Sequence, residues 1–239
     1  MSSVCNRTTP AARSLRVLAA LLGYPDAERR GFLPQMGKVL RQEAALSAAA
    51  VSAIEVLIGE LAGGDPLDVE ADYVALFDRG RATSLHLFEH VHGDSRERGP
   101  AMVDLAQTYA QAGLLLAPGE LPDYLPVVLE FVSTQPAAEA QAFLAEMAHI
   151  FGAIFSALQQ RGSPYACVLG ALLEIAGEPI VASAPLAGPE PEQGLDATWA
   201  EPLAFDGCST KGQAKPGQEQ VLHFVPRTQP HSAQPGAAA

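Results

Sequence analysis

A long amphipathic stretch at residues 137–160 most strongly limits what this chain can fold into. Its large apolar side chains recur at spacings of three and four, which places them on one face of a helix. They are Phe143, Met147, Ile150, Phe151, Ile154, Phe155 and Leu158. Pro136 precedes the stretch at a position suited to a first helical turn, and Gly162 follows its end. The pattern predicts a long helix that must bury one face against other elements.

Segments with the same period occur on both sides of this stretch. A capping box at Asp94 and Glu97 is expected to begin a helix that ends at Gly113. Further helices are expected over residues 13–22, 26–42, 45–61, 66–77, 123–133 and 165–176. The last of these is apolar on most sides and belongs at the centre of a core. Alternating strand patterns and fixed-period repeats do not occur. The sequence therefore predicts an all-α fold, a compact helical bundle.

Composition divides the chain at about residue 177. Residues 177–239 hold 7 of the 21 Gly and 9 of the 19 Pro, a content typical of largely disordered segments. We therefore expect a helical domain over residues 1–176 and a flexible, largely disordered Pro/Gly-rich tail over residues 177–239. Trp199 and Phe205 bound a short apolar segment of the tail, residues 199–205, which is expected to dock on another surface.

The charge balance limits the classes of partner. The chain has 27 acidic residues and 15 Lys or Arg, for a formal net charge of −12. A nucleic-acid binder needs a basic surface, and an anionic membrane surface attracts basic segments, so neither is an expected partner. No run of 18 apolar residues occurs, so no membrane insertion is expected. Cys5, Cys167 and Cys208 are too far apart for a metal or disulfide motif, which fits a reducing compartment.

One string in the chain resembles a catalytic metal motif. His86, Glu89 and His90 match the H-x-x-E-H pattern of inverted zinc peptidases. On a helix, the two imidazoles would share a face, and the Glu carboxylate could act on a zinc-bound water. A catalytic zinc needs a third protein ligand, and the sequence marks none. A zinc-dependent hydrolase is therefore the alternative, and histidines in a structural or partner-facing hydrogen-bond network are the favoured interpretation.

Four arginines flank this string among acidic residues. They are Arg79, Arg81, Arg96 and Arg98. These arginines could form ordinary ion pairs, or two of them could together bind a phosphate or carboxylate.

Serine-hydrolase elbows, phosphate loops and dinucleotide fingerprints are absent from the sequence. An all-α chain without catalytic motifs is predicted to bind a partner rather than to catalyse a reaction.

Two segments of the chain resemble a known family. The first is Tyr73-Val74-Ala75-Leu76-Phe77-Asp78-Arg79-Gly80-Arg81 with Ser84-Leu85-His86-Leu87-Phe88-Glu89-His90-Val91-His92-Gly93. The second is Glu120-Leu121-Pro122-Asp123-Tyr124-Leu125-Pro126. Both resemble the NarJ family, the assembly chaperones of respiratory nitrate reductase. That family belongs to the all-helical redox-enzyme maturation chaperones that include TorD and DmsD. The resemblance covers roughly residues 14–176, with an echo at residues 199–202.

The resemblance implies a TorD-like bundle and a chaperone that is not an enzyme. Such a chaperone binds the apo catalytic (alpha) subunit of nitrate reductase in the cytoplasm, through the N-terminal peptide of that subunit. It permits insertion of the molybdenum cofactor and iron–sulfur clusters, delays membrane docking and is absent from the finished enzyme. It binds no cofactor stably itself. The alpha–beta complex and molybdenum cofactor biosynthesis proteins are further partners that the resemblance implies.

The resemblance also implies where the client peptide binds. In the wider group, a Y-x-x-L-F motif and an E-P-x-D-H motif mark the peptide-binding region. The second motif departs from the pattern here, because Leu121 is inserted and Tyr124 replaces the histidine. The expected client-binding residues are Tyr73, Leu76, Phe77, Asp78, Arg79, Leu85, His86, Phe88, Glu89, His90, Glu120, Pro122, Asp123 and Tyr124. For the apolar members of the first segment, plain core packing is the open alternative.

Physical reasoning gives a binding role further support. An amphipathic helix commonly binds in an apolar groove between helices. Three or four buried anchors would contribute roughly 1.5–3 kcal/mol each, against an association cost on the order of 4–15 kcal/mol. The complex should therefore be moderately stable and reversible, as a chaperone requires.

A third hypothesis is that the protein is an acidic adaptor whose Pro-rich tail is the active part.

Overall fold

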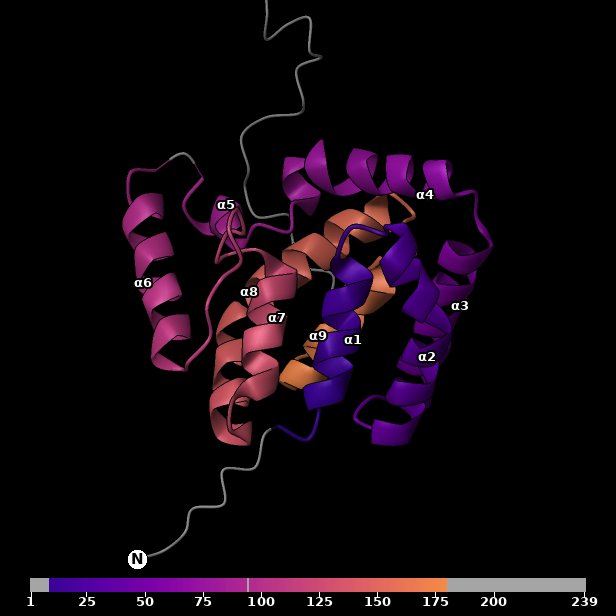
Figure 1. Cartoon of the computed structure of the whole chain (residues 1–239), viewed down its shortest axis with the longest axis horizontal. Coiled ribbons are helices and arrows are strands. Elements are labelled where there is room, and N and C mark those ends of the chain that lie inside the picture. The colour runs from indigo at the N-terminus through magenta and orange to yellow at the C-terminus, as the bar shows by residue number, and fades with distance from the viewer. Residues whose placement is uncertain (1–8, 94, 180–239) are drawn as a thin grey trace, which may run out of the picture. The chain divides into compact units, whose positions relative to one another are not determined.

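Helices form most of residues 9–93 and 95–179, which the computed structural model describes (Figure 1). The α-helices are α1 (Ala12–Leu22), α2 (Ala27–Glu43), α3 (Ala48–Gly63), α4 (Pro66–Tyr73), α5 (Leu87–Val91), α6 (Arg98–Gln111), α7 (Leu125–Thr134), α8 (Ala137–Gln160) and α9 (Ala166–Ala176). A π-helical turn, η1 (Val74–Asp78), continues α4, and a 3₁₀ turn, η2 (Arg81–Thr83), follows it. Within the described residues no β-strand occurs, and an isolated antiparallel bridge joins His86 and Tyr124. The prediction of an all-α bundle is confirmed.

Side-chain caps fix the starts of α2, α3 and α4. The Asp26 carboxylate accepts a hydrogen bond from the Arg29 amide at 2.8 Å, and the Ser47 hydroxyl accepts one from the Ala50 amide at 3.2 Å. The Asp65 carboxylate accepts from the Leu67 amide at 2.9 Å, with Pro66 in the first turn. These bonds satisfy amides that have no partner within the helix.

The core lies where α8 and α9 pack together and where α1 packs on α7. Val168, Leu169 and Leu172 of α9 are fully buried, as expected for a helix that is apolar on most sides. In Figure 1, α2 and α3 lie on one side of this centre and α6 lies at the opposite edge. Tyr109 is the buried residue of α6, so this helix attaches to the bundle through few contacts.

Among the described helices, α8 is long and apolar enough to cross a membrane, by length and hydropathy alone. Of its most apolar window, 56% is buried inside the bundle. Phe151 and Ile154 at its centre are fully buried. These features are those of a core helix.

Three sequence expectations differ from the structure or fall beyond it. The helix expected over residues 66–77 ends at Tyr73, because the chain continues as the π turn η1. The expected capping box includes Asp94, which lies outside the described residues, and no side chain caps α6. The expected tail from residue 180 onward, with the segment 199–205, also lies outside the described residues.

Candidate functional site

The Y-x-x-L-F motif lies at the junction of α4 and η1. In the π turn, the Arg79 amide donates to the Val74 carbonyl oxygen at 3.3 Å. The rings of Tyr73 and Phe77 face the core, where both side chains are 4% exposed and their centroids lie 4.8 Å apart. π-Helical turns are rare and occur frequently at functional sites. The motif therefore combines a buried aromatic pair with an irregular backbone turn.

Burial separates the predicted groove residues into two groups. Tyr73, Phe77 and Leu85 are core residues, so Phe77 and Leu85 can only support a binding surface from beneath. Leu76 and Phe88 are partly exposed. Plain core packing thus describes most of this apolar set.

The two motifs meet at a pair of hydroxyl groups. The Tyr73 hydroxyl donates to the Leu22 carbonyl oxygen at 2.7 Å and lies 3.1 Å from the Tyr124 hydroxyl. Burial raises the pKa of both phenols above the ordinary value, so both stay protonated. Tyr124, which replaces the expected histidine, thus acts as a hydrogen-bond partner in a partly buried contact.

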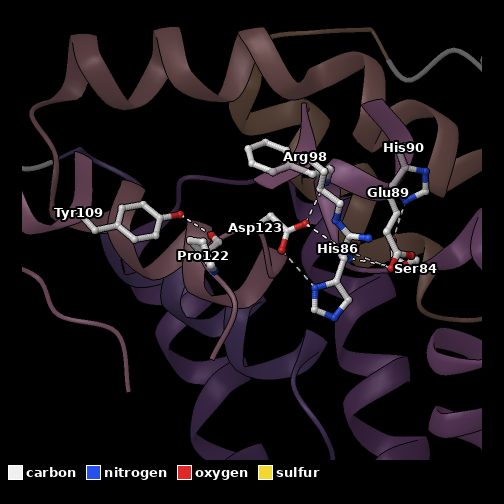
Figure 2. A network of polar contacts seen from close by, with 9 residues as sticks. Ser84, His86, Glu89, His90, Arg98, Tyr109, Pro122 and Asp123 are labelled. Atoms are coloured by element: carbon white, nitrogen blue, oxygen red, sulfur yellow. Dashed lines mark hydrogen bonds and ion pairs between the residues drawn. The ribbon is translucent and has the colours of Figure 1, made fainter. Parts of the chain in front are cut away.

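A buried carboxylate organises the neighbouring segment (Figure 2). Asp123 is fully buried, and its Oδ2 accepts a hydrogen bond from the Phe88 amide at 3.1 Å. His86 Nδ1 lies 3.3 Å from Oδ1, and Arg98 Nη2 lies 3.9 Å from Oδ2. The backbone amides of Leu87 and Leu125 donate across the bridge to the carbonyl oxygens of Asp123 and Leu85. We call Asp123 and these side-chain and amide partners the Asp123 network.

Asp123 also shifts the titration of its histidine partner. The hydrogen bond from His86 to Asp123 raises the pKa of the imidazole, although burial acts in the opposite direction. The imidazole is therefore charged over a wider range of pH than a free histidine.

The three residues of the H-x-x-E-H string have three different partners. His86 contacts Asp123, Glu89 Oε1 lies 3.5 Å from Arg98 Nη2, and His90 Nε2 lies 2.8 Å from the Ser84 carbonyl oxygen. Burial lowers the pKa of His90, so the neutral ring donates this bond. Helix α5 begins at Leu87, so His86 lies outside it and the expected shared face does not form. Across residues 9–93 and 95–179, no three His, Cys, Asp or Glu are grouped to hold a metal ion, so the zinc interpretation has no structural support.

Sequence reasoning missed one residue of this region, Tyr109, and left two interpretations of Arg98 open. The Tyr109 hydroxyl donates to the Pro122 carbonyl oxygen at 2.8 Å, which links α6 to the second motif (Figure 2). Tyr109 falls within the helix that is expected to end at Gly113, and the pattern of that helix does not indicate the hydroxyl bond. Arg98 forms an ion pair with Glu89, so the ion-pair interpretation fits it. Asp78, Arg79 and Glu120 are exposed and lie outside the Asp123 network.

A groove of about 640 Å³ opens beside the π turn. Its walls come from the end of α3, from α4 and η1, and from the segment that leads into α9. Leu57, Leu61, Val69, Leu76 and Pro164 give it an apolar floor. Of the predicted client-binding residues, Tyr73 and Leu76 line it. We call this hollow the α3–α4 groove.

A smaller cavity of about 330 Å³ lies near α7. It is lined by Tyr109, Leu114, Leu116, Val127 and Phe131, among others. The predicted residue Glu120 belongs to this cavity and does not line the α3–α4 groove.

The family model described as "Nitrate reductase delta subunit" matches residues 41–169. The matched span includes both motifs, the Asp123 network and the α3–α4 groove. The chain belongs to the nitrate reductase delta subunit family. This confirms the resemblance to nitrate reductase assembly chaperones that the motifs indicate.

Several proteins similar to this chain are named as assembly chaperones of nitrate reductase. The chain is 42% identical over 204 residues to the nitrate reductase molybdenum cofactor assembly chaperone NarJ of Escherichia coli, covering 81% of this chain and 86% of the relative. It is 36% identical to the probable chaperone NarW of E. coli, covering 78% and 80%. It is 32% identical to the probable NarJ of Bacillus subtilis, covering 70% and 89%. The family is thus one of maturation chaperones, in agreement with the prediction of a non-enzymatic role.

A solved structure with a similar fold is available for comparison. It is that of a putative redox enzyme maturation protein from Archaeoglobus fulgidus, with a TM-score of 0.50 and 17% identity. The match covers 74% of this chain and all of that one, 100%. At this level of identity, the comparison establishes the shared fold alone.

Proposed function

We propose that this protein is a cytoplasmic, system-specific chaperone of respiratory nitrate reductase. It binds the apo catalytic subunit through the N-terminal peptide of that subunit. The α3–α4 groove is the observation that carries this proposal, because it is an apolar hollow beside the Y-x-x-L-F motif of a delta subunit family member. The relatives named as assembly chaperones support the choice of client.

The groove suits an amphipathic helix. Its volume of about 640 Å³ lies within the range of ligand pockets, about 300–1,000 Å³. A helical peptide would place side chains at spacings of three and four against the floor formed by Leu57, Leu61 and Leu76. Because only a few anchors are buried, the complex can form and dissociate during one cycle of assembly.

Retention of the peptide explains the remaining steps of assembly. A client that is held by one terminal segment stays open while the molybdenum cofactor and the iron–sulfur clusters are inserted. The same contact delays docking on the membrane subunit, and its release leaves the chaperone out of the finished enzyme. The alpha–beta complex and cofactor biosynthesis proteins are partners at this stage. The molybdenum cofactor is inserted into the client, and the chaperone itself does not hold it stably.

Calorimetric titration of the full chain with the N-terminal peptide of its cognate catalytic subunit tests this proposal. We expect one-to-one binding with a Kd of about 1–100 µM. A peptide of the same composition in scrambled order is the control and should not bind. Absence of heat and of any complex at high micromolar concentration would contradict the proposed function.

A further inference from the structure

The π turn η1 is anchored by a residue outside the Y-x-x-L-F motif. Thr83, in the 3₁₀ turn η2, is fully buried, and its hydroxyl donates a hydrogen bond to the Leu76 carbonyl oxygen. The Gly80 carbonyl oxygen lies 3.1 Å from the same hydroxyl and accepts the Thr83 amide at 3.1 Å. Leu76 lines the α3–α4 groove, whereas Thr83 does not. Thr83 therefore holds the backbone of a groove residue from inside the protein.

This bond satisfies a carbonyl group at the end of a helical segment. The last carbonyl groups of a helix have no partner within it, and η1 ends at Asp78, so the Leu76 carbonyl is one of these groups. Buried polar groups are nearly always hydrogen-bonded. Because π turns are rare, groups outside the turn must favour it over a continued α-helix. The Thr83 hydroxyl is such a group, since it bonds the turn directly.

Gly80 leaves the space that this contact needs. A Cβ atom at this position would lie 2.6 Å from the Thr83 hydroxyl oxygen and 2.8 Å from Nη2 of Arg161, which is closer than van der Waals contact allows. Arg161 follows the end of α8 and lines the α3–α4 groove. Since η2 packs on α8, the missing side chain of Gly80 lets a second groove residue approach the same turn.

We infer that Thr83 is a positioning residue for the α3–α4 groove and that Gly80 permits its contact. The Thr83 hydroxyl keeps the π turn in the shape that presents the Leu76 side chain to the client peptide. Neither Thr83 nor Gly80 lines the groove, so both act through Leu76. This inference rests on the proposed function and adds to it a residue that the peptide cannot reach.

Two substitutions of Thr83 separate its hydroxyl from the rest of the side chain. Thr83→Val keeps the branched shape and removes the donor, whereas Thr83→Ser keeps the donor and removes a methyl group. The full chain is titrated by calorimetry with the N-terminal peptide of its cognate catalytic subunit. Thr83→Val should bind about two- to tenfold more weakly than wild type, as expected for the loss of one hydrogen bond. Thr83→Ser should keep wild-type affinity, although the lost methyl group lowers its stability.

Ser156→Ala is the matched control for the loss of a buried hydroxyl. The Ser156 hydroxyl donates to the Gly152 carbonyl oxygen at 2.8 Å within α8, and neither residue lines the groove. This variant should lose stability and keep wild-type affinity. Urea unfolding checks that each variant is folded at the temperature of the titration.

Gly80→Ala tests the same contact by steric displacement. The added Cβ must move the Thr83 hydroxyl, so this variant should also bind about two- to tenfold more weakly. Gly31→Ala in α2 is its control, because a Cβ there meets no atom within 4 Å. The control should keep wild-type affinity.

Hydrogen exchange reports on the turn in the absence of the client. The Arg79 amide donates to the Val74 carbonyl oxygen within the π turn, so its exchange follows local opening. In the free protein, exchange of this amide should be about two- to tenfold faster in Thr83→Val than in wild type. It should be unchanged in Thr83→Ser and in Ser156→Ala.

The outcomes separate this inference from the proposed function. If wild type binds the peptide and Thr83→Val binds it equally well, the positioning role is wrong and the proposed function stands. The same holds if Thr83→Ser loses as much affinity as Thr83→Val. Unchanged exchange of the Arg79 amide in Thr83→Val would overturn the inference alone. If wild type does not bind the peptide, both are overturned.

Discussion

The Asp123 network and the α3–α4 groove differ in how far their polar groups are buried. The Asp123 carboxylate is fully buried and faces an amide, an imidazole and a guanidinium. The groove, by contrast, has exposed carboxylates along its rim and an apolar floor. A buried network with its partners in place stabilises one conformation, whereas exposed carboxylates beside an apolar floor are accessible to a ligand. The comparison favours a structural role for the network and agrees with the recognition role that we propose for the groove.

The largest effect should come from Asp123→Ala. This change removes the buried carboxylate that accepts from the Phe88 amide and pairs with His86 and Arg98. Breaking a buried charge pair from one side typically costs about 3–5 kcal/mol, so we expect a loss of that size in the free energy of unfolding in urea. Asp123→Asn, which keeps an acceptor oxygen, should lose less. Equal stability of Asp123→Ala and wild type would remove the structural role of the network.

A smaller loss is expected for Tyr73→Phe. It leaves the Leu22 carbonyl oxygen without its donor and the Tyr124 hydroxyl without its partner, at a cost of about 1–2 kcal/mol. Tyr24→Phe is the matched control, because the Tyr24 hydroxyl bonds Glu70 at an exposed position and its loss should cost under about 0.5 kcal/mol. Thermal and urea unfolding measure both. Similar losses for the two variants would show that the hydrogen bonds of the Tyr73 hydroxyl stabilise the fold no more than an exposed hydrogen bond does.

The contribution of His86 should depend on pH. Because its pKa is raised in the folded state, the stability that its charged form adds is fully present below the unfolded pKa of about 6.5. That stability is lost as pH rises through the folded pKa. The difference in unfolding free energy between wild type and His86→Gln should therefore shrink with rising pH, from a value below about 1 kcal/mol. A difference that grows with pH would contradict the assigned ion pair.

The smallest effect on stability should come from Tyr165→Phe. Its hydroxyl makes no hydrogen bond to a described residue, so removing it should change the free energy of unfolding by no more than about 0.5 kcal/mol. The contrast with Tyr73→Phe is direct, since both are buried tyrosines of one aromatic cluster. A loss of more than about 1 kcal/mol would mean that the hydroxyl has a partner within the chain.

Periodicity predicted the helices well, because burial of one face is what stabilises them. The stripe from Phe143 to Leu158 became α8, and the apolar segment after Tyr165 became α9. The π turn after Tyr73 could not be read from the sequence, since a pattern of period 3.6 continues through it. The alternative zinc site required His86 and His90 on one helix, but the bridge to Tyr124 and the contact with Asp123 place His86 before the helix begins.

The candidate site could be predicted only in part. The motifs located Tyr73 and Leu76, which line the groove. Leu57, Leu61 and Tyr165 lie far from them in the sequence and reach the groove through packing of α3 and α9, which no local pattern encodes. No pattern of the sequence distinguishes Tyr109 from Tyr165, although the Tyr109 hydroxyl is bonded and the Tyr165 hydroxyl has no partner among the described residues.

The measurement that most directly tests the central claim is a paired calorimetric titration of Leu76→Asn and Leu67→Asn with the client peptide. Both leucines lie in the α4–η1 segment, but Leu76 lines the groove and Leu67 is 75% exposed outside it. If the groove is the binding site, Leu76→Asn should lose at least about tenfold in affinity and Leu67→Asn should match wild type. Equal affinities of the two folded variants would show that the client binds elsewhere.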